Sequence, residues 1–168
     1  MNKPCFKDLV ARELFLNPGD TGVGFRGEVF GTLLGSCVAI TLWHPRRRLG
    51  TICHFVFPFA PGLSDRDGRY GISAFARMQS DLIRNGVHLH ECTAKIFGGG
   101  RMFASSSSQD IGARNIAMAR QLVADAGLTV AAENVGKDGY RRLYFDVESG
   151  DVWVKFDWLD GEQEDEIL

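Results

Sequence analysis

The 168-residue chain has 19 Lys and Arg against 21 Asp and Glu, which gives a formal net charge of −2 and a sequence pI near 6.1. This balance argues against a nucleic-acid-binding protein, because neutralising phosphates requires a basic surface. A chain of this length makes one ordinary domain, which buries about 70% of the surface exposed by its unfolded state. The 20 glycines favour turns and close backbone approaches, as in α/β or α+β folds.

The first twenty residues contain no apolar segment of signal-peptide type, and no stretch approaches the roughly 20 apolar residues of a membrane span. We therefore expect a cytoplasmic protein without membrane insertion. Its four cysteines, Cys5, Cys37, Cys53 and Cys92, should be reduced there. No two of them stand at CxxC or zinc-ligand spacing, so no metal site is expected and each thiol is considered singly.

After an irregular N-terminal region, residues 36–43 and 49–58 have the composition of two strands. The polar loop between them, His44 to Arg47, contains a proline and has a length common in hairpins. We expect an antiparallel hairpin.

Two helices and four further strands are predicted downstream. Residues 70–85 carry apolar side chains at helical spacing before Gly86, and a second helix is expected from about residue 109 with Ser108 as its cap. The further strands are residues 92–98, 128–135, 141–148 and 151–158, the last two forming a hairpin. We expect one domain over residues 1–158 and a disordered acidic tail over 159–168.

The predicted hairpin brings a thiol next to an imidazole. If the loop is His44 to Arg47, Trp43 faces Arg48 and, further along, Cys37 faces His54. Opposed residues project from one side of a sheet with Cβ atoms about 4.5 to 5.5 Å apart. The other side then holds an apolar set: Val38, Ile40, Leu42, Leu49, Thr51 and Cys53.

This register singles out Cys37 among the four thiols. Cys53 would lie in the core as a small hydrophobe, whereas Cys37 would lie beside a base that can make it a thiolate. Spacing alone leaves open the alternative of a buried thiol and a satisfied core histidine.

Four blocks of the sequence carry a family resemblance. TLLGSCVAITLWHP from Thr32, GTICHFVFP from Gly50, KIFGGGRMF from Lys95 and IGARN from Ile111 resemble CheD, the chemoreceptor glutamine deamidase family of bacterial chemotaxis. The similarity spans most of residues 20–150, with the four blocks in the family's order.

The resemblance implies that Cys37 is a nucleophile, that His54 is its general base, and that Thr32 is a third polar residue. It also implies an α+β fold with a mixed or antiparallel sheet layered with helices, similar to papain-like and toxin deamidase cysteine hydrolases. The substrate would be a glutamine on the cytoplasmic helices of a chemoreceptor, with methylated glutamate as a second substrate. A family partner would be a CheC-type phosphatase.

The expected mechanism needs no cofactor. The thiolate attacks the glutamine side-chain carbonyl, and backbone amides near Gly35, Ser36 and Cys37 stabilise the oxyanion. Gly98 and Gly99 are expected in a loop of close backbone approach whose amides contact substrate. Two alternatives remain: a non-catalytic module that binds and stimulates a CheC-type phosphatase, and a redox thiol protein, which the missing CxxC pair disfavours.

Overall fold

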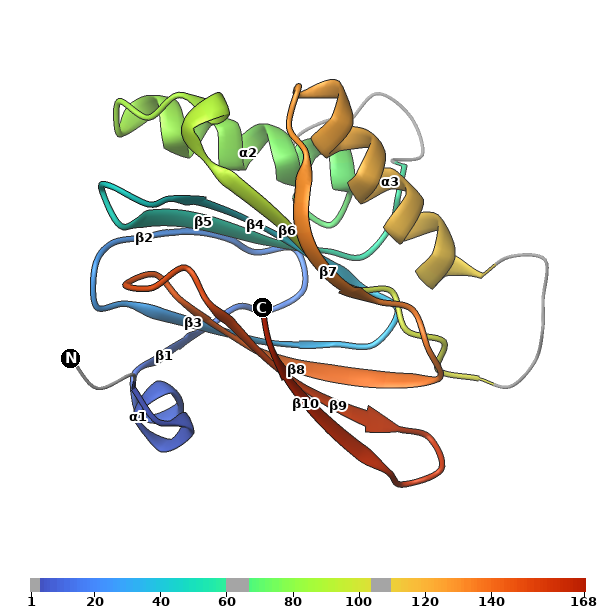
Figure 1. The fold of residues 1–168 in the computed structure, drawn as a ribbon. Coiled ribbons are helices and arrows are strands. Elements are labelled where there is room, and N and C mark those ends of the chain that lie inside the picture. Colours follow the sequence, from blue (N-terminus) through green and yellow to red (C-terminus); the bar gives the residue numbers. More distant parts are fainter. Residues whose placement is uncertain (1–3, 60–66, 104–109) are drawn as a thin grey trace.

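The computed structural model describes residues 4–59, 67–103 and 110–168, and in it two five-stranded sheets are stacked face to face (Figure 1). From edge to edge, the first sheet contains β1 (Glu13–Phe15), β3 (Val29–Leu34), β8 (Gly139–Asp146), β9 (Val152–Trp158) and β10 (Gln163–Ile167). The second contains β2 (Thr21–Gly24), β5 (Leu49–Phe55), β4 (Val38–His44), β6 (Thr93–Gly98) and β7 (Val130–Val135). We call them the β8 sheet and the β4 sheet.

Helices cover the free faces of the two sheets. The longer ones, α2 (Gly71–Arg84) and α3 (Ile111–Asp125), lie on the β4 sheet, and the short α1 (Phe6–Ala11) lies against the β8 sheet (Figure 1). A 3-10 turn at Leu89–Glu91 precedes β6. No helix in the described part of the chain is long and apolar enough to cross a membrane.

Alternate residues of β4 point into two different cores. Val38, Ile40 and Leu42 are fully buried in the cluster beneath α2 and α3. Ala39 points the other way, into the cluster between the two sheets, as Phe97 of β6 does. This alternation with a period of two fits a central strand that is buried on both faces.

Much of the predicted architecture is confirmed. The fold is α+β with two mixed sheets, the predicted helices correspond to α2 and α3, and the predicted strands correspond to β4 to β9. The N-cap of α3 is Asp110, whose carboxylate accepts a hydrogen bond from the Ala113 amide. Ser108, the expected cap, lies outside the described residues.

Two predictions about the chain ends were wrong. The N-terminal region holds β1, β2 and β3 rather than irregular structure. The acidic tail forms β10, which pairs antiparallel with β9. The paired backbone and two side-chain contacts explain its order, since Glu164 meets Lys137 and Glu166 accepts a hydrogen bond from Asn134.

The hairpin register differs from the predicted one by two residues. Ala39, not Cys37, lies opposite His54. The loop is shifted by one position because His44 joins β4, held by hydrogen bonds to Glu91 and to the Arg47 amide. Arg48 ends the loop with a positive φ of 46°. A shift of two keeps every residue on its predicted face.

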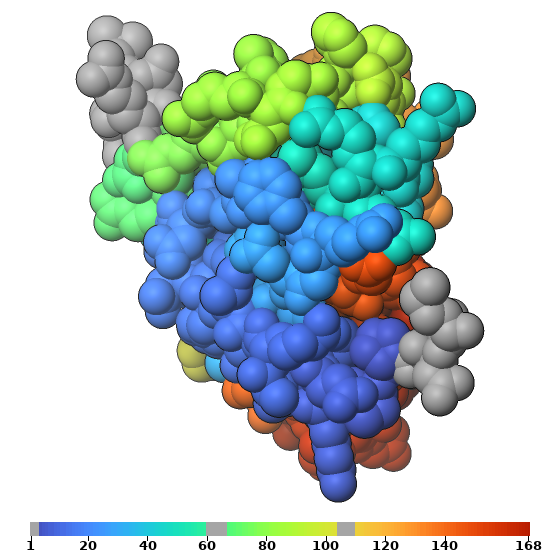
Figure 2. Space-filling view, turned by 90° about the vertical axis from the view of Figure 1, so that its left-hand side faces the viewer, coloured from blue at the N-terminus to red at the C-terminus, as the bar shows by residue number. Residues whose placement is uncertain are grey.

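The two ends of this hairpin lie at opposite ends of the molecule. Figure 2 views the end with the β4–β5 turn, in teal, where N-terminal residues in blue cover much of the surface. Cys37 directly precedes β4 and therefore lies at the other end, where β3 passes into β4.

Candidate active site

The segment that carries Cys37 is held by hydrogen bonds to three successive carbonyl groups. The Gly100 amide donates to the Gly35 oxygen at 2.8 Å, and the Gly99 amide donates to the Cys37 oxygen at 2.8 Å. Between them, the Nδ2 group of Asn115 on α3 donates to the Ser36 oxygen at 3.0 Å. The backbone next to the thiol is therefore fixed, while the Cys37 side chain stays partly exposed.

Glycine is required where the loop after β6 meets this segment. Gly98 and Gly99 have positive φ values of 106° and 68°. A Cβ atom on Gly98 would lie 2.3 Å from the Cys37 oxygen, closer than any real contact. These glycines thus hold the segment that carries Cys37, and the expected contact of their amides with substrate stays a prediction.

Two backbone donors beside the thiol have no partner in the described part of the chain. The N–H groups of Ser36 and Cys37 make no hydrogen bond to another described residue. The carbonyl groups of Gly35, Ser36 and Cys37 are all engaged on the side of α3 and the glycine loop, whereas the N–H group of Gly35 likewise has no hydrogen bond to another described residue. The N–H groups of Ser36 and Cys37 remain the candidate oxyanion donors.

His54 is buried between the two sheets, and its ring is oriented by Thr32 of β3. The Thr32 Oγ1 atom lies 2.7 Å from His54 Nδ1 and 2.9 Å from the backbone oxygen of Leu16. A hydroxyl has one proton, which goes to the Leu16 carbonyl, so Thr32 accepts from an Nδ1–H group. This hydrogen bonding assigns the tautomer in which Nε2 is unprotonated and can act as a base.

Cys37 and His54 lie on the same side of the β4 sheet. Because Ala39 is directly opposite His54, Cys37 is the diagonal neighbour. Within a ladder, diagonal neighbours lie about 7 to 8 Å apart with their Cβ atoms somewhat closer; Cys37 stands one residue beyond the last paired step, Val38 with Phe55. The Nε2 atom has no hydrogen-bond partner among the described residues. No hydrogen bond joins Cys37 to His54 among the described residues; catalytic hydrogen bonds often tighten only when substrate binds.

Burial keeps both groups neutral. It lowers the pKa of His54 to about 4, against a smaller opposing effect of the Asp20 carboxylate. Burial also raises the pKa of the Cys37 thiol, partly offset by its own backbone N–H. The resting pair is therefore a thiol and an imidazole rather than an ion pair. Cys53 is fully buried and its pKa is raised to about 12, which makes it unreactive.

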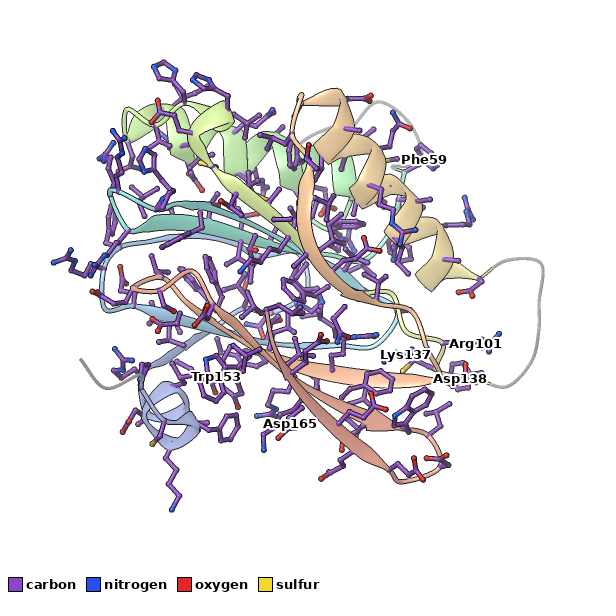
Figure 3. The ribbon with its side chains drawn as sticks, viewed as in Figure 1. Phe59, Arg101, Lys137, Asp138, Trp153 and Asp165 are labelled. Atoms are coloured by element: carbon purple, nitrogen blue, oxygen red, sulfur yellow. The ribbon has the colours of Figure 1, made fainter. Side chains whose placement is uncertain are left out.

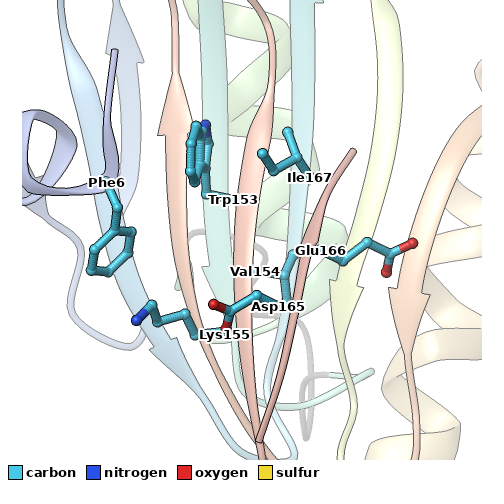
Figure 4. Close-up of a pocket in the computed structure, with 7 residues that line it drawn as sticks. All are labelled: Phe6, Trp153, Val154, Lys155, Asp165, Glu166 and Ile167. Carbon is cyan, nitrogen blue, oxygen red and sulfur yellow. The ribbon is translucent and has the colours of Figure 1, made fainter. Parts of the chain in front are cut away.

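Two cavities lie outside this group of residues. One of about 200 Å³ adjoins Gly99, near Arg101, Lys137 and Asp138, which lie together in Figure 3. Another of about 280 Å³ lies on the outer face of the β8 sheet, between Phe6, Trp153 and Ile167 (Figure 4). Neither is lined by Cys37, His54 or Thr32.

The residue that sequence reasoning missed is Asn115. It lies in the block IGARN, within the apolar stripe that Ile111 and Met118 define on α3. The signal available in the sequence was a polar residue within an apolar stripe. The structure shows Asn115 fully buried, and a buried polar side chain is retained only where it has hydrogen-bond partners.

Comparison with known proteins gives the family. Residues 59–156 match the family model described as CheD chemotactic sensory transduction. A relative from Dechloromonas aromatica, named probable chemoreceptor glutamine deamidase CheD 3, is 44% identical over 148 residues, which cover 86% of this chain and 87% of the relative. A relative from Pseudomonas fluorescens, named probable chemoreceptor glutamine deamidase CheD, is 37% identical over 164 residues, 95% of this chain and 93% of the relative.

Among solved structures, the chain is similar to the Bacillus licheniformis hypothetical protein YfiH, with 17% identity and a TM-score of 0.45 over 68% of this chain and 49% of that one. This likeness is too distant to carry an argument. The alignments with the two relatives span most of this chain and most of each relative. Together with the family match, they decide the assignment: the chain belongs to the CheD family.

Proposed function

We propose that this protein is a chemoreceptor glutamine deamidase, which hydrolyses the side-chain amide of receptor glutamines to give glutamate and ammonia. The observation that carries the proposal is the hydrogen bond from His54 to Thr32, which leaves Nε2 unprotonated on the face of the sheet that also presents Cys37. The names of the relatives supply the substrate class.

The reaction proceeds through a thioester. As Nε2 of His54 takes the Cys37 proton, the sulfur attacks the amide carbonyl, and the amides of Ser36 and Cys37 donate to the oxyanion. The imidazolium then protonates the leaving nitrogen, so that ammonia departs. A water molecule that gives its proton to Nε2 attacks the thioester and regenerates the thiol, with glutamate as the product. A methylated glutamate would follow the same path and release methanol.

In this proposal Thr32 fixes the ring of His54. A fold similar to that of papain-like and toxin deamidase cysteine hydrolases is part of this proposal, with a cysteine, a histidine and a third polar side chain that orients it. The reaction needs a free thiol, which the reducing cytoplasm preserves, and no cofactor. A CheC-type phosphatase is proposed as a second partner, on the same surface as the receptor.

Replacing Thr32 by valine tests the orienting role. Thr32→Val keeps the shape of the side chain but leaves Nδ1–H and the Leu16 carbonyl unpaired. We expect kcat to fall by about 10 to 100-fold, with KM changed less than about threefold, because the base is misaligned rather than removed. The measurement is the rate of ammonia release from a receptor cytoplasmic fragment. Thr32→Ser, which retains a hydroxyl, should recover much of the rate; equal losses in both variants would argue against the orienting hydrogen bond.

The pH dependence tests the buried base. Because the pKa of His54 is lowered to about 4, the imidazole stays unprotonated as the pH falls below neutral, and activity is lost only as the pH falls through about 4. We expect kcat/KM, measured from initial rates of ammonia release, to fall less than about twofold between pH 7 and pH 5. An ordinary histidine base, with a pKa of about 6.5, would lose most of the rate over that range.

The decisive test of the function is mass spectrometry of receptor fragments after incubation with the protein. A gain of about one mass unit at particular glutamines, together with ammonia release, is expected. If the parent protein releases no ammonia, yet both it and Cys37→Ala bind a CheC-type phosphatase, the protein is a binding module instead.

A further inference from the structure

Asn115 joins the two halves of the candidate site through one side chain. Its Nδ2 group donates to the Ser36 oxygen at 3.0 Å and to the Val56 oxygen at 2.8 Å. Ser36 is the residue before Cys37, and Val56 lies two residues after His54. Thus a single amide group spans the backbone on either side of the proposed nucleophile and base.

The chemistry of this contact requires an amide. Both partners are carbonyl oxygens, so the side chain must present its two N–H donors, and no carboxylate or hydroxyl of similar size supplies two. Asn115 is fully buried, and its Oδ1 atom has no hydrogen-bond partner in the described part of the chain. Burial of this unpaired acceptor is unfavourable and opposes the stabilisation that the two donor hydrogen bonds provide.

The place of Asn115 in the fold gives the contact a purpose. Val56 follows Phe55, which pairs with Val38 in the last step of the β4–β5 ladder. Beyond this step the Cys37 segment and the segment after β5 are no longer paired in the ladder, and Asn115 bridges them from α3. Figure 1 shows that α3 begins at this end of the molecule.

We propose that Asn115 is a positioning residue for the deamidation reaction: its amide sets the separation between the Cys37 thiol and the His54 ring by tying the Ser36 and Val56 carbonyls together. This inference rests on the proposed function. Asn115 touches neither the substrate nor the reacting atoms; it acts through the two segments that carry them. Glycine-loop contacts fix the Cys37 side of the pair. Beyond the Val38–Phe55 step of the ladder, Asn115 is the side chain that links this segment to the β5 side among the hydrogen bonds of the described residues.

The first test compares Asn115→Ala with Val123→Ala. Val123 is fully buried on the same helix, and its side chain cannot donate a hydrogen bond to the Ser36 or Val56 carbonyl. Val123→Ala therefore measures the effect of weaker packing of α3 alone. At a temperature where circular dichroism shows both variants folded, Asn115→Ala should lower kcat by up to about 100-fold with KM nearly unchanged. Val123→Ala should keep kcat within about twofold. Equal rates for the two variants would overturn the proposal.

The second test separates positioning from a general structural role and needs no receptor. The rate of Cys37 alkylation by iodoacetamide is measured with and without Asn115→Ala, in the parent and in a His54→Asn background. If Asn115 acts by aligning the thiol with the imidazole, Asn115→Ala changes the rate by about tenfold in the parent and by less than about twofold in the background without the base. The same change in both backgrounds would contradict positioning.

A second variant covers failure of the first to fold. Asn115→Ser keeps one donor in a smaller side chain and should give a smaller change than Asn115→Ala in both measurements. Absence of ammonia release by the parent would defeat the proposed function, whereas the alkylation cycle would still report on Asn115. The two ideas therefore fail separately.

Discussion

Cys37→Ala should abolish ammonia release from a receptor fragment, with kcat at least about 10⁴-fold below that of the parent. The physical reason is that the thioester cannot form without the sulfur, and no other thiol is placed to replace it. Cys53 is sealed in the core beneath the helices, and Cys92 is also buried. Cys37 alone lies at the inter-sheet face with His54 and keeps a partly exposed side chain.

Cys5→Ala is the matched control for this variant. Cys5 is an exposed free thiol at the N-cap of α1, far along the chain from the site, so its removal tests the loss of a cysteine as such. We expect its kcat to stay within about twofold of the parent. The melting temperatures of both variants, followed by circular dichroism, show whether the fold is kept. Turnover by Cys37→Ala at the rate of Cys5→Ala would remove the thiol from the mechanism.

The face on which Cys37 lies could be predicted because it depends on alternation. The apolar residues Val38, Ile40 and Leu42 must point into one core, which sends Cys37 to the other side whatever the exact pairing. The register itself could not be predicted, since it depends on how the turn closes. His44 is the last residue of β4, and its ring is hydrogen-bonded to the carboxylate of Glu91, which is distant in the sequence.

Other features depend on long-range contacts that no local pattern contains. The position of Thr32 against His54 requires the two sheets to stack, so the family resemblance could suggest the residue but not its distance. The sequence of the acidic tail predicts an unstructured segment because its charged residues have no partners nearby in the chain. In the structure, Lys137 and Asn134, which follow α3, contact Glu164 and Glu166. Pairing with β9 satisfies the backbone of the tail.

His54→Asn should lower kcat at neutral pH by about 10² to 10⁴-fold, the range ascribed to a general base. Asparagine places an amide near the position of Nδ1, so the donor to Thr32 can be kept while the acceptor at Nε2 is lost. The substitution therefore removes the base with little change to the contact between the sheets. His90→Asn, at an exposed histidine, is the control and should leave kcat unchanged.

The pH profile of the same variant distinguishes loss of the base from loss of the fold. Without an internal base the thiolate must form by ionisation to solvent, and burial raises the pKa of the Cys37 thiol above its ordinary value. The residual rate of His54→Asn should therefore increase about tenfold per pH unit through the neutral range, while the rate of the parent stays level. A misfolded variant would be slow at every pH. A His54→Asn variant with parental activity and a level profile would show that the imidazole does not take the proton, and the proposed thioester mechanism would need another base.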